Sequence, residues 1–170
     1  MSHDTARLTI TSWGSVELPE DDPIFGTFWL AGSREEGCAT GVVAAIAFAE
    51  RRVSEADFRC FGPAKRRFEP RRIVVRDASQ RLVLGGKVVG EAIEWCMPVA
   101  SDEEAARVRQ QADALNNDGE LENGWDNYST AQGLWAQAAL VEARLVDPAW
   151  RTHTLATLQA RSHSRDHSIA

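Results

Sequence analysis

The chain has 170 residues, of which 44% are hydrophobic and 26% charged, and its formal net charge is −6. This length and composition are typical of one globular domain with a packed core, and they exclude wholesale disorder. The longest apolar run, residues 41–49, is shorter than the roughly 18 residues of a membrane-spanning helix. An isoelectric point near 5.2 disfavours a dedicated nucleic-acid binder.

The first hundred residues carry the patterns of β-strands. Alternating side chains, or a high content of β-branched and aromatic residues, predict strands at residues 7–12, 24–31, 72–77, 81–84 and 87–97. Two prolines in residues 19–23 predict a loop between the first two strands. Gly32-Ser33 is expected to end the second strand, and residues 61–70 are expected to form a loop.

Helical patterns dominate the second half of the chain. Residues 40–53 are Ala-rich and favour a helix, although their continuous apolar character also suits a buried strand. The capping box at residues 101–104 predicts the start of a helix, and Asn and Gly predict its end near residues 116–119. A second helix is predicted for about residues 129–146, before Asp147-Pro148.

These elements predict an α+β fold, in which a meander-like antiparallel sheet is covered on one face by the two C-terminal helices. We expect residues 1–150 to form a single domain. From residue 151 the apolar content thins, so residues 151–170 are expected to form a polar tail that is partly disordered.

Basic residues concentrate in the middle of the chain. Residues 51–81 hold ten basic side chains against four acids, whereas residues 1–50 hold two arginines against eight acids. Guanidinium groups suit carboxylates and phosphates, so this block, with Arg66 and Arg67, is suited to grip an acidic partner or nucleic acid if it lies on one face. Alternatively, these arginines pair internally with the acids that flank them.

The histidines argue against hydrolytic chemistry of the Ser-His-Asp or Cys-His kind, because such a site needs an imidazole as its base. All four lie near the ends of the chain: His3, His153, His163 and His167. The last two have the spacing of metal ligands on a helix, but no third ligand accompanies them. We therefore expect no metal and no cofactor.

The cysteines indicate a reducing compartment. They are odd in number and widely spaced, at Cys38, Cys60 and Cys96, and no basic, apolar export signal opens the chain. We expect reduced, buried thiols in a cytoplasmic protein.

An enzyme is the alternative hypothesis. It would act on an anionic substrate beside the arginine block, through Cys60, whose cationic neighbours favour a reactive thiol, or through carboxylate pairs such as Glu91/Glu94 and Glu120/Glu122. Because the chain has 25 acids, such pairs arise without any function, and no set of catalytic residues is predicted.

The most distinctive segment is Leu-Glu-Asn-Gly-Trp-Asp-Asn-Tyr, residues 121–128. Trp125, Asp126 and Tyr128 are suited to an exposed recognition patch, because Trp and Tyr combine large rigid surfaces with a polar end. Alternatively, Trp125 fills the core, Asp126 caps the next helix and Tyr128 covers its start.

The function predicted from these observations is binding: a small cytoplasmic protein of inhibitor or immunity type that occupies a basic protein partner. The residues expected to bind are Trp125, Asp126, Tyr128, the acidic turn Glu20, Asp21 and Asp22, and Arg66 and Arg67. A nucleic-acid accessory protein that uses residues 51–81 is a further alternative. The sequence leaves the oligomeric state open.

Overall fold

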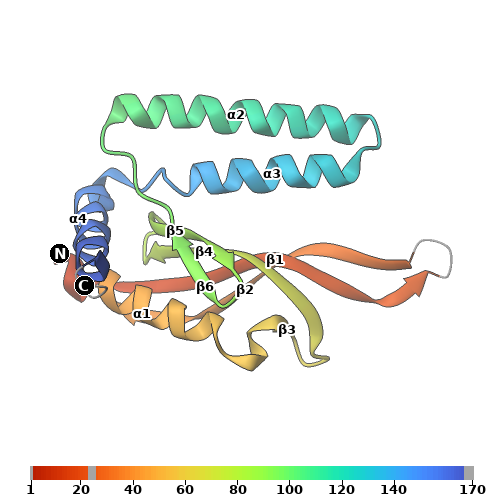
Figure 1. Cartoon of the computed structure of the whole chain (residues 1–170), viewed down its shortest axis with the longest axis horizontal. Helices are drawn as coiled ribbons and strands as arrows, with labels where there is room; N and C mark the ends of the chain where they lie inside the picture. The colour runs from red at the N-terminus through yellow and green to blue at the C-terminus, as the bar shows by residue number, and fades with distance from the viewer. Residues whose placement is uncertain (1, 23–25, 167–170) are drawn as a thin grey trace. The chain divides into compact units, whose positions relative to one another are not determined.

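The computed structural model describes the backbone of residues 2–22 and 26–166, and their side chains except at residues 19–22, 26–28 and 165–166. Within these residues the fold is mixed α+β, as the sequence predicts. A six-stranded antiparallel sheet is combined with four α-helices, and three of the helices follow the sheet in the chain, not two (Figure 1).

Two compact units make up the structure. Unit 1 holds residues 1–80 and 86–94, and unit 2 holds residues 81–85 and 95–170. The boundary runs through one strand of the sheet, so the chain passes from one unit to the other three times. The sequence predicts one domain over residues 1–150, and no linker in its composition marks this boundary.

The strands follow the order β2-β1-β4-β5-β6, with β3 beside β4. They are β1 (Arg7–Asp22), β2 (Gly26–Thr40), β3 (Cys60–Phe61), β4 (Arg66–Asp77), β5 (Leu82–Val89) and β6 (Ala92–Trp95). Strands β4, β5 and β6 are consecutive neighbours, which confirms the predicted meander. The predicted strands at residues 81–84 and 87–97 are divided differently, because β5 runs without a break to Val89 and the chain turns at residues 90–91. The predicted loop at residues 61–70 is confirmed only for residues 62–65, because Phe61 belongs to β3 and β4 begins at Arg66 and pairs with both β1 and β3.

The β1–β2 hairpin is longer than predicted. β1 continues to Asp22, so the expected loop at residues 19–23 is wrong for residues 19–22, and residue 23 lies outside the described residues. β2 continues through Gly32-Ser33, so the strand end expected there is also wrong. Beyond Val16, β1 has no register with β4 and pairs only with β2. Pro19 has no backbone N–H, and a strand without a neighbour on one side tolerates such a residue. The register between β1 and β2 also shifts between Glu17 and Asp21.

Helix α1 (Val42–Val53) confirms the predicted helix in this region, and it contacts β1 and β2. Its apolar face is buried through Val42, Ala45, Ile46, Ala49 and Val53. These positions recur every three or four residues, which is the spacing of one helix face. The largest fully buried side chains of unit 1 include Phe58, Phe68, Leu8, Ile10 and Ile73.

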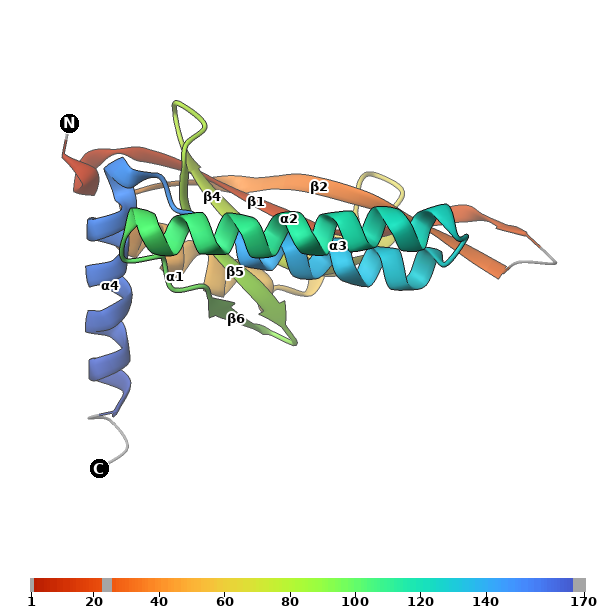
Figure 2. The same cartoon turned by 90° about the horizontal axis from the view of Figure 1, so that it is seen from above.

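The helices of unit 2 are α2 (Asp102–Gly124), α3 (Tyr128–Glu142) and α4 (Pro148–Asp166). The predicted capping box is confirmed, because the Ser101 hydroxyl accepts the Glu104 N–H at 3.1 Å. Figures 1 and 2 show α2 and α3 lying side by side along their length.

The bounds of these helices differ from the predicted ones: α3 ends at Glu142, four residues before the predicted end at residue 146. α2 does not end at residues 116–119 but continues to Gly124, because Gly119 is buried against α3. The expected polar tail is helical as far as Asp166, and its side chains are not all solvated: the buried Thr154 hydroxyl donates to the Val83 carbonyl at 3.0 Å. Residues 167–170 lie outside the described residues.

Candidate functional site

The arginine block does not lie on one face of the sheet. The Ser12 hydroxyl donates to Glu36, which also binds Arg52 of α1, so Ser12 faces the side that α1 occupies. Successive residues of a strand point to opposite faces, so Trp13 and its cross-strand neighbour Arg72 point to the other side. The arginines of residues 51–76 are thereby divided between two surfaces of unit 1, whereas Arg81 belongs to unit 2.

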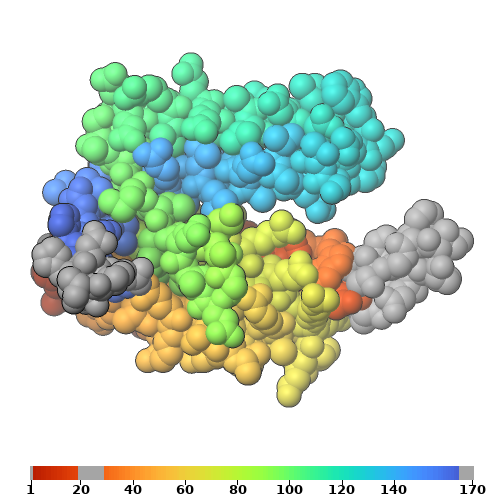
Figure 3. Space-filling view, in the orientation of Figure 1, coloured from red at the N-terminus to blue at the C-terminus, as the bar shows by residue number. Residues whose placement is uncertain are grey.

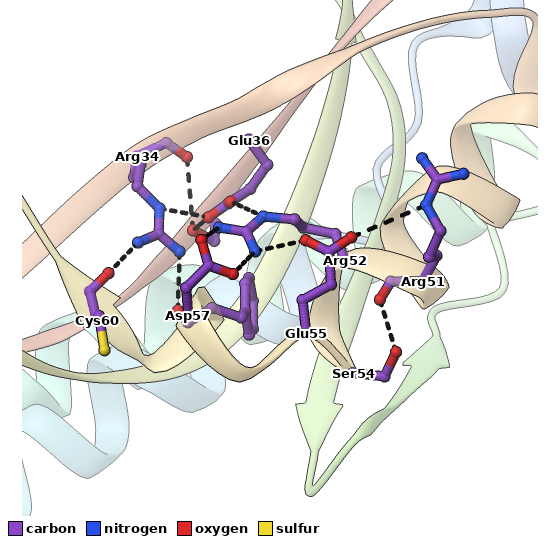
Figure 4. Close-up of polar contacts among 10 residues, drawn as sticks. Arg34, Glu36, Arg51, Arg52, Ser54, Glu55, Asp57 and Cys60 are labelled. Atoms are coloured by element: carbon purple, nitrogen blue, oxygen red, sulfur yellow. Dashed lines mark hydrogen bonds and ion pairs between the residues drawn. The ribbon is translucent and has the colours of Figure 1, made fainter.

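The densest polar cluster in unit 1 centres on Glu36 (Figure 4). Its side chain is 1% exposed and lies between two guanidinium groups: Arg34 Nε is 2.7 Å from Oε1, and Arg52 Nε is 2.8 Å from Oε2. The Ser12 hydroxyl donates to the same Oε1. Both oxygens of this buried carboxylate are therefore occupied by partners within the chain.

Arg52 extends this cluster to the surface. Its Nη1 is 2.7 Å from Glu55 Oε2 and 2.6 Å from Asp57 Oδ1. Burial alone would lower the pKa of Arg52, but the hydrogen bonds and charges of Asp57, Glu36 and Glu55 raise it above its ordinary value. The hydrogen bond from Arg52 lowers the pKa of Asp57.

Arg34 joins the cluster to the segment after α1. It donates to the Phe58 carbonyl at 2.8 Å and to the Cys60 carbonyl, and its guanidinium lies 5.2 Å from the centre of the Phe68 ring. These contacts tie β2, α1 and the segment at residues 56–61 together. Because the donors and acceptors are used internally, we assign the cluster a structural role.

A different surface presents free aromatic groups, at the turn between α2 and α3. We call residues 118–128 the hairpin tip. Within it, Trp125 is 71% exposed, Tyr128 57% and Leu121 56%. The alternative in which Trp125 fills the core is therefore wrong. Tyr128 is the first residue of α3, and Asn127, not Asp126, stands at its N-cap.

Hydrogen bonds order the turn of the hairpin tip. Asp126 adopts a left-handed conformation (φ +59°), and its Oδ1 accepts the Tyr128 hydroxyl at 2.6 Å. The backbone N–H of Asn127 donates to the Glu122 carbonyl at 2.9 Å, and its side-chain amide donates to Glu122 Oε2 at 2.7 Å. The hydrogen bond with Asp126, together with its charge, raises the pKa of Tyr128.

The hairpin tip is acidic and lacks internal cations. No Lys, Arg or His occurs in residues 110–143, which hold six acids: Asp113, Asp118, Glu120, Glu122, Asp126 and Glu142. Ion pairs among the described residues involve other acids, such as Glu36 and Glu104. The aromatic groups therefore stand in a negative field that no neighbouring charge in the sequence offsets.

The residues predicted to bind belong to three segments of the structure. Trp125, Asp126 and Tyr128 share the hairpin tip. Arg66 and Arg67 begin β4, where Arg67 is 66% exposed and stacks on the Trp29 ring at 5.6 Å. The acidic residues at 20–22 belong to β1, and their side chains are outside the described residues.

Sequence reasoning missed Leu121 as part of this surface. Leu121 precedes Trp125 by four residues, the spacing that places two side chains on one face of a helix. The four-residue spacing is visible in the sequence, but it was not applied because α2 was expected to end before residue 121. The buried Glu36 was missed because the residues that surround it come from segments far apart in the sequence.

The residues of the enzyme hypothesis come from separate segments of the chain: Cys60 is in β3, and Glu120 and Glu122 are in α2. Cys60, Cys38 and Cys96 form no disulfide, and they are half-buried and not fully buried as predicted. Glu91 and Glu94 are exposed in the β5–β6 hairpin. His163 contacts the Gln159 carbonyl through Nδ1 at 2.7 Å, while His167 lies outside the described residues.

No group of three or more His, Cys, Asp or Glu side chains among the described residues is placed to hold a metal ion. Across residues 2–22 and 26–166, no helix combines the length and the apolar character needed to cross a lipid bilayer. Comparison of the chain with protein-family models, curated proteins and solved structures gives no match.

Proposed function

We propose that this protein is a binding protein of inhibitor or immunity type, which occupies a basic protein partner with its hairpin tip. The observation that supports this most is the exposure of Trp125, Tyr128 and Leu121 on one ordered turn. Binding energy in protein interfaces is concentrated in a few residues, and Trp and Tyr are enriched among them.

The order of the turn favours high affinity. The hydrogen bond from Tyr128 to Asp126 and the bonds from Asn127 to Glu122 hold the turn before any partner arrives. A surface that is already ordered loses less conformational entropy on binding. Figure 3 shows the α2–α3 hairpin, in green to blue, as a continuous surface.

The negative charge of the hairpin tip indicates that the partner surface is positively charged. Asp118, Glu120 and Asp126 are exposed, and no basic residue occurs in residues 110–143. Such a field accelerates association with a basic surface, and the effect weakens as salt rises. We further propose a cytoplasmic location, which the absence of disulfides at the three cysteines supports.

The test is a pulldown from a lysate of the host organism, followed by titration of the purified partner. We expect a basic protein that elutes as salt rises. Trp125→Ala should weaken its binding by ~2 kcal/mol, or about 30-fold, mainly through faster dissociation. Glu120→Gln should slow association and flatten the salt dependence.

Two matched variants serve as controls. Val43→Ala changes an exposed apolar residue of α1, and Glu91→Gln removes an exposed charge from the β5–β6 hairpin. Both should bind as the unaltered protein does. The proposal fails if the captured protein is acidic, or if Trp125→Ala binds it no more weakly than Val43→Ala does.

A further inference from the structure

We propose that the hairpin tip selects arginine over lysine in its partner, by stacking a guanidinium group on the Trp125 indole next to the Asp126 carboxylate. This inference rests on the proposed function and names the chemistry that the same surface recognises.

The first support is that the Trp125 ring is uncovered. Arg72 lies over the Trp13 ring at 5.0 Å and Arg67 over the Trp29 ring at 5.6 Å. In the described part of the chain no cation lies over Trp125, and residues 110–143 contain none that could reach it locally. The 71% exposed indole is thus open to a cation from another molecule.

The second support is the state of the neighbouring carboxylate. Asp126 Oδ1 accepts the neutral hydroxyl of Tyr128, which orders the side chain without neutralising it. A carboxylate has acceptor positions on both oxygens, so Oδ2 and the remaining lone pairs can accept N–H groups from a ligand. Glu122 is held in a similar way, by the neutral amide of Asn127.

These two features favour a guanidinium over an ammonium group. A planar guanidinium stacks flat on an indole while its N–H groups point outward in the ring plane toward an acceptor. An ammonium is more strongly hydrated and carries no flat surface, so it gains less from the ring. Trp is the ring that binds cations best, and arginine is its more frequent partner in proteins.

The probes for the experiment are two peptides of equal length and charge, one alternating arginine with serine and the other lysine with serine. Their affinities are measured by titration calorimetry at low salt, for the unaltered protein and for Trp125→Leu, which keeps an apolar side chain but removes the aromatic ring. Val43→Leu, on the exposed side of α1, is the matched control.

We expect the arginine peptide to bind about two- to five-fold more tightly than the lysine peptide, which corresponds to a cation–π contribution at an exposed site. Trp125→Leu should abolish this preference, and Val43→Leu should keep it. Equal affinities for the unaltered protein would overturn the arginine inference and leave charge-driven binding in place. A preference that survives Trp125→Leu would also overturn it. If neither peptide binds, the proposed function fails as well.

Discussion

Gly119 of α2 lies directly against the indole ring of Trp135 in α3, so that a Cβ atom on residue 119 would stand 2.5 Å from the ring nitrogen Nε1. No other residue type has a side chain small enough for this position. The glycine therefore allows close contact between the two helices that present the hairpin tip.

Gly119→Ala should destabilise the protein in spite of its better helix propensity. Alanine gains up to ~1 kcal/mol over glycine within a helix, whereas forcing a side chain into a packed contact costs about 1–3 kcal/mol. We expect a net loss in the free energy of unfolding, measured with urea. Gly133→Ala in α3, where the added Cβ meets nothing within 4 Å, should instead raise stability.

Glu36→Gln should be among the most destabilising conservative substitutions in unit 1. It leaves Arg34 and Arg52 largely buried without the carboxylate between them, and removing one partner of a buried ion pair costs about 3 kcal/mol or more. Chemical denaturation measures the loss. Glu35→Gln, at the neighbouring exposed position, should stay within ~0.5 kcal/mol of the unaltered protein, and equal effects of the two substitutions would contradict the role given to Glu36.

Acid should weaken the fold partly through Glu104. The backbone N–H of Ala100 and then Arg144 lower the pKa of this carboxyl below its ordinary value of 4.5. A lowered pKa in the folded state means that the charged form stabilises the protein above pH 4.5, and that this contribution is lost as the pH falls further. Unfolding by urea at a series of pH values should show a smaller acid loss in Glu104→Gln than in Glu103→Gln. Identical pH dependence in both would count against this assignment.

Tyr128 is the one tyrosine in the chain, so its ionisation can be followed by phenolate absorbance. Its hydrogen bond to Asp126, and the charge of that group, place the pKa of Tyr128 above the ordinary 10.0. We expect Asp126→Asn to lower the midpoint of the titration, and Glu120→Gln to lower it less. A midpoint in the unaltered protein at or below 10.0 would show that the turn is open in solution.

Thr154→Val tests whether α4 is a packed helix. The substitution keeps the volume but removes the buried hydrogen bond to the Val83 carbonyl, which should cost about 1–2 kcal/mol of unfolding free energy. Thr152→Val, on an exposed position of the same helix, controls for the change in helix propensity. Equal stabilities of the two variants would favour the solvated tail that the composition suggests.

Local signals in the sequence predict local structure well. The capping box at Ser101 depends on residues within one turn of the helix start, so its pattern is visible in the chain. Likewise, the apolar run at residues 42–53 forms the helix that its alanine content favours. The predicted end of the second helix is less accurate, because α3 ends at Glu142 and Pro148 begins α4.

Contacts between distant residues account for what the sequence does not predict. α2 passes its expected end because Trp135, sixteen positions further on, packs on Gly119. α4 is ordered although polar, since the bond from Thr154 reaches a strand 71 positions earlier. Trp125 is a related case: composition favours burial of a tryptophan, so burial stayed an alternative to the exposed patch, and the turn that places the ring outside depends on the length of α2.

The division of β5 between the two units has a consequence for dissecting the protein. The Leu82 carbonyl accepts the N–H of Asp147, and the Gly85 carbonyl accepts the N–H of Cys96. Residues 81–85 therefore supply hydrogen-bond acceptors to the rest of unit 2. A fragment that starts at residue 95 would lack these acceptors, and a fragment that stops at residue 80 would lack the strand that returns at residues 86–94. Neither unit corresponds to a contiguous stretch of the gene, and expressing either one alone would require a circularly permuted or spliced chain.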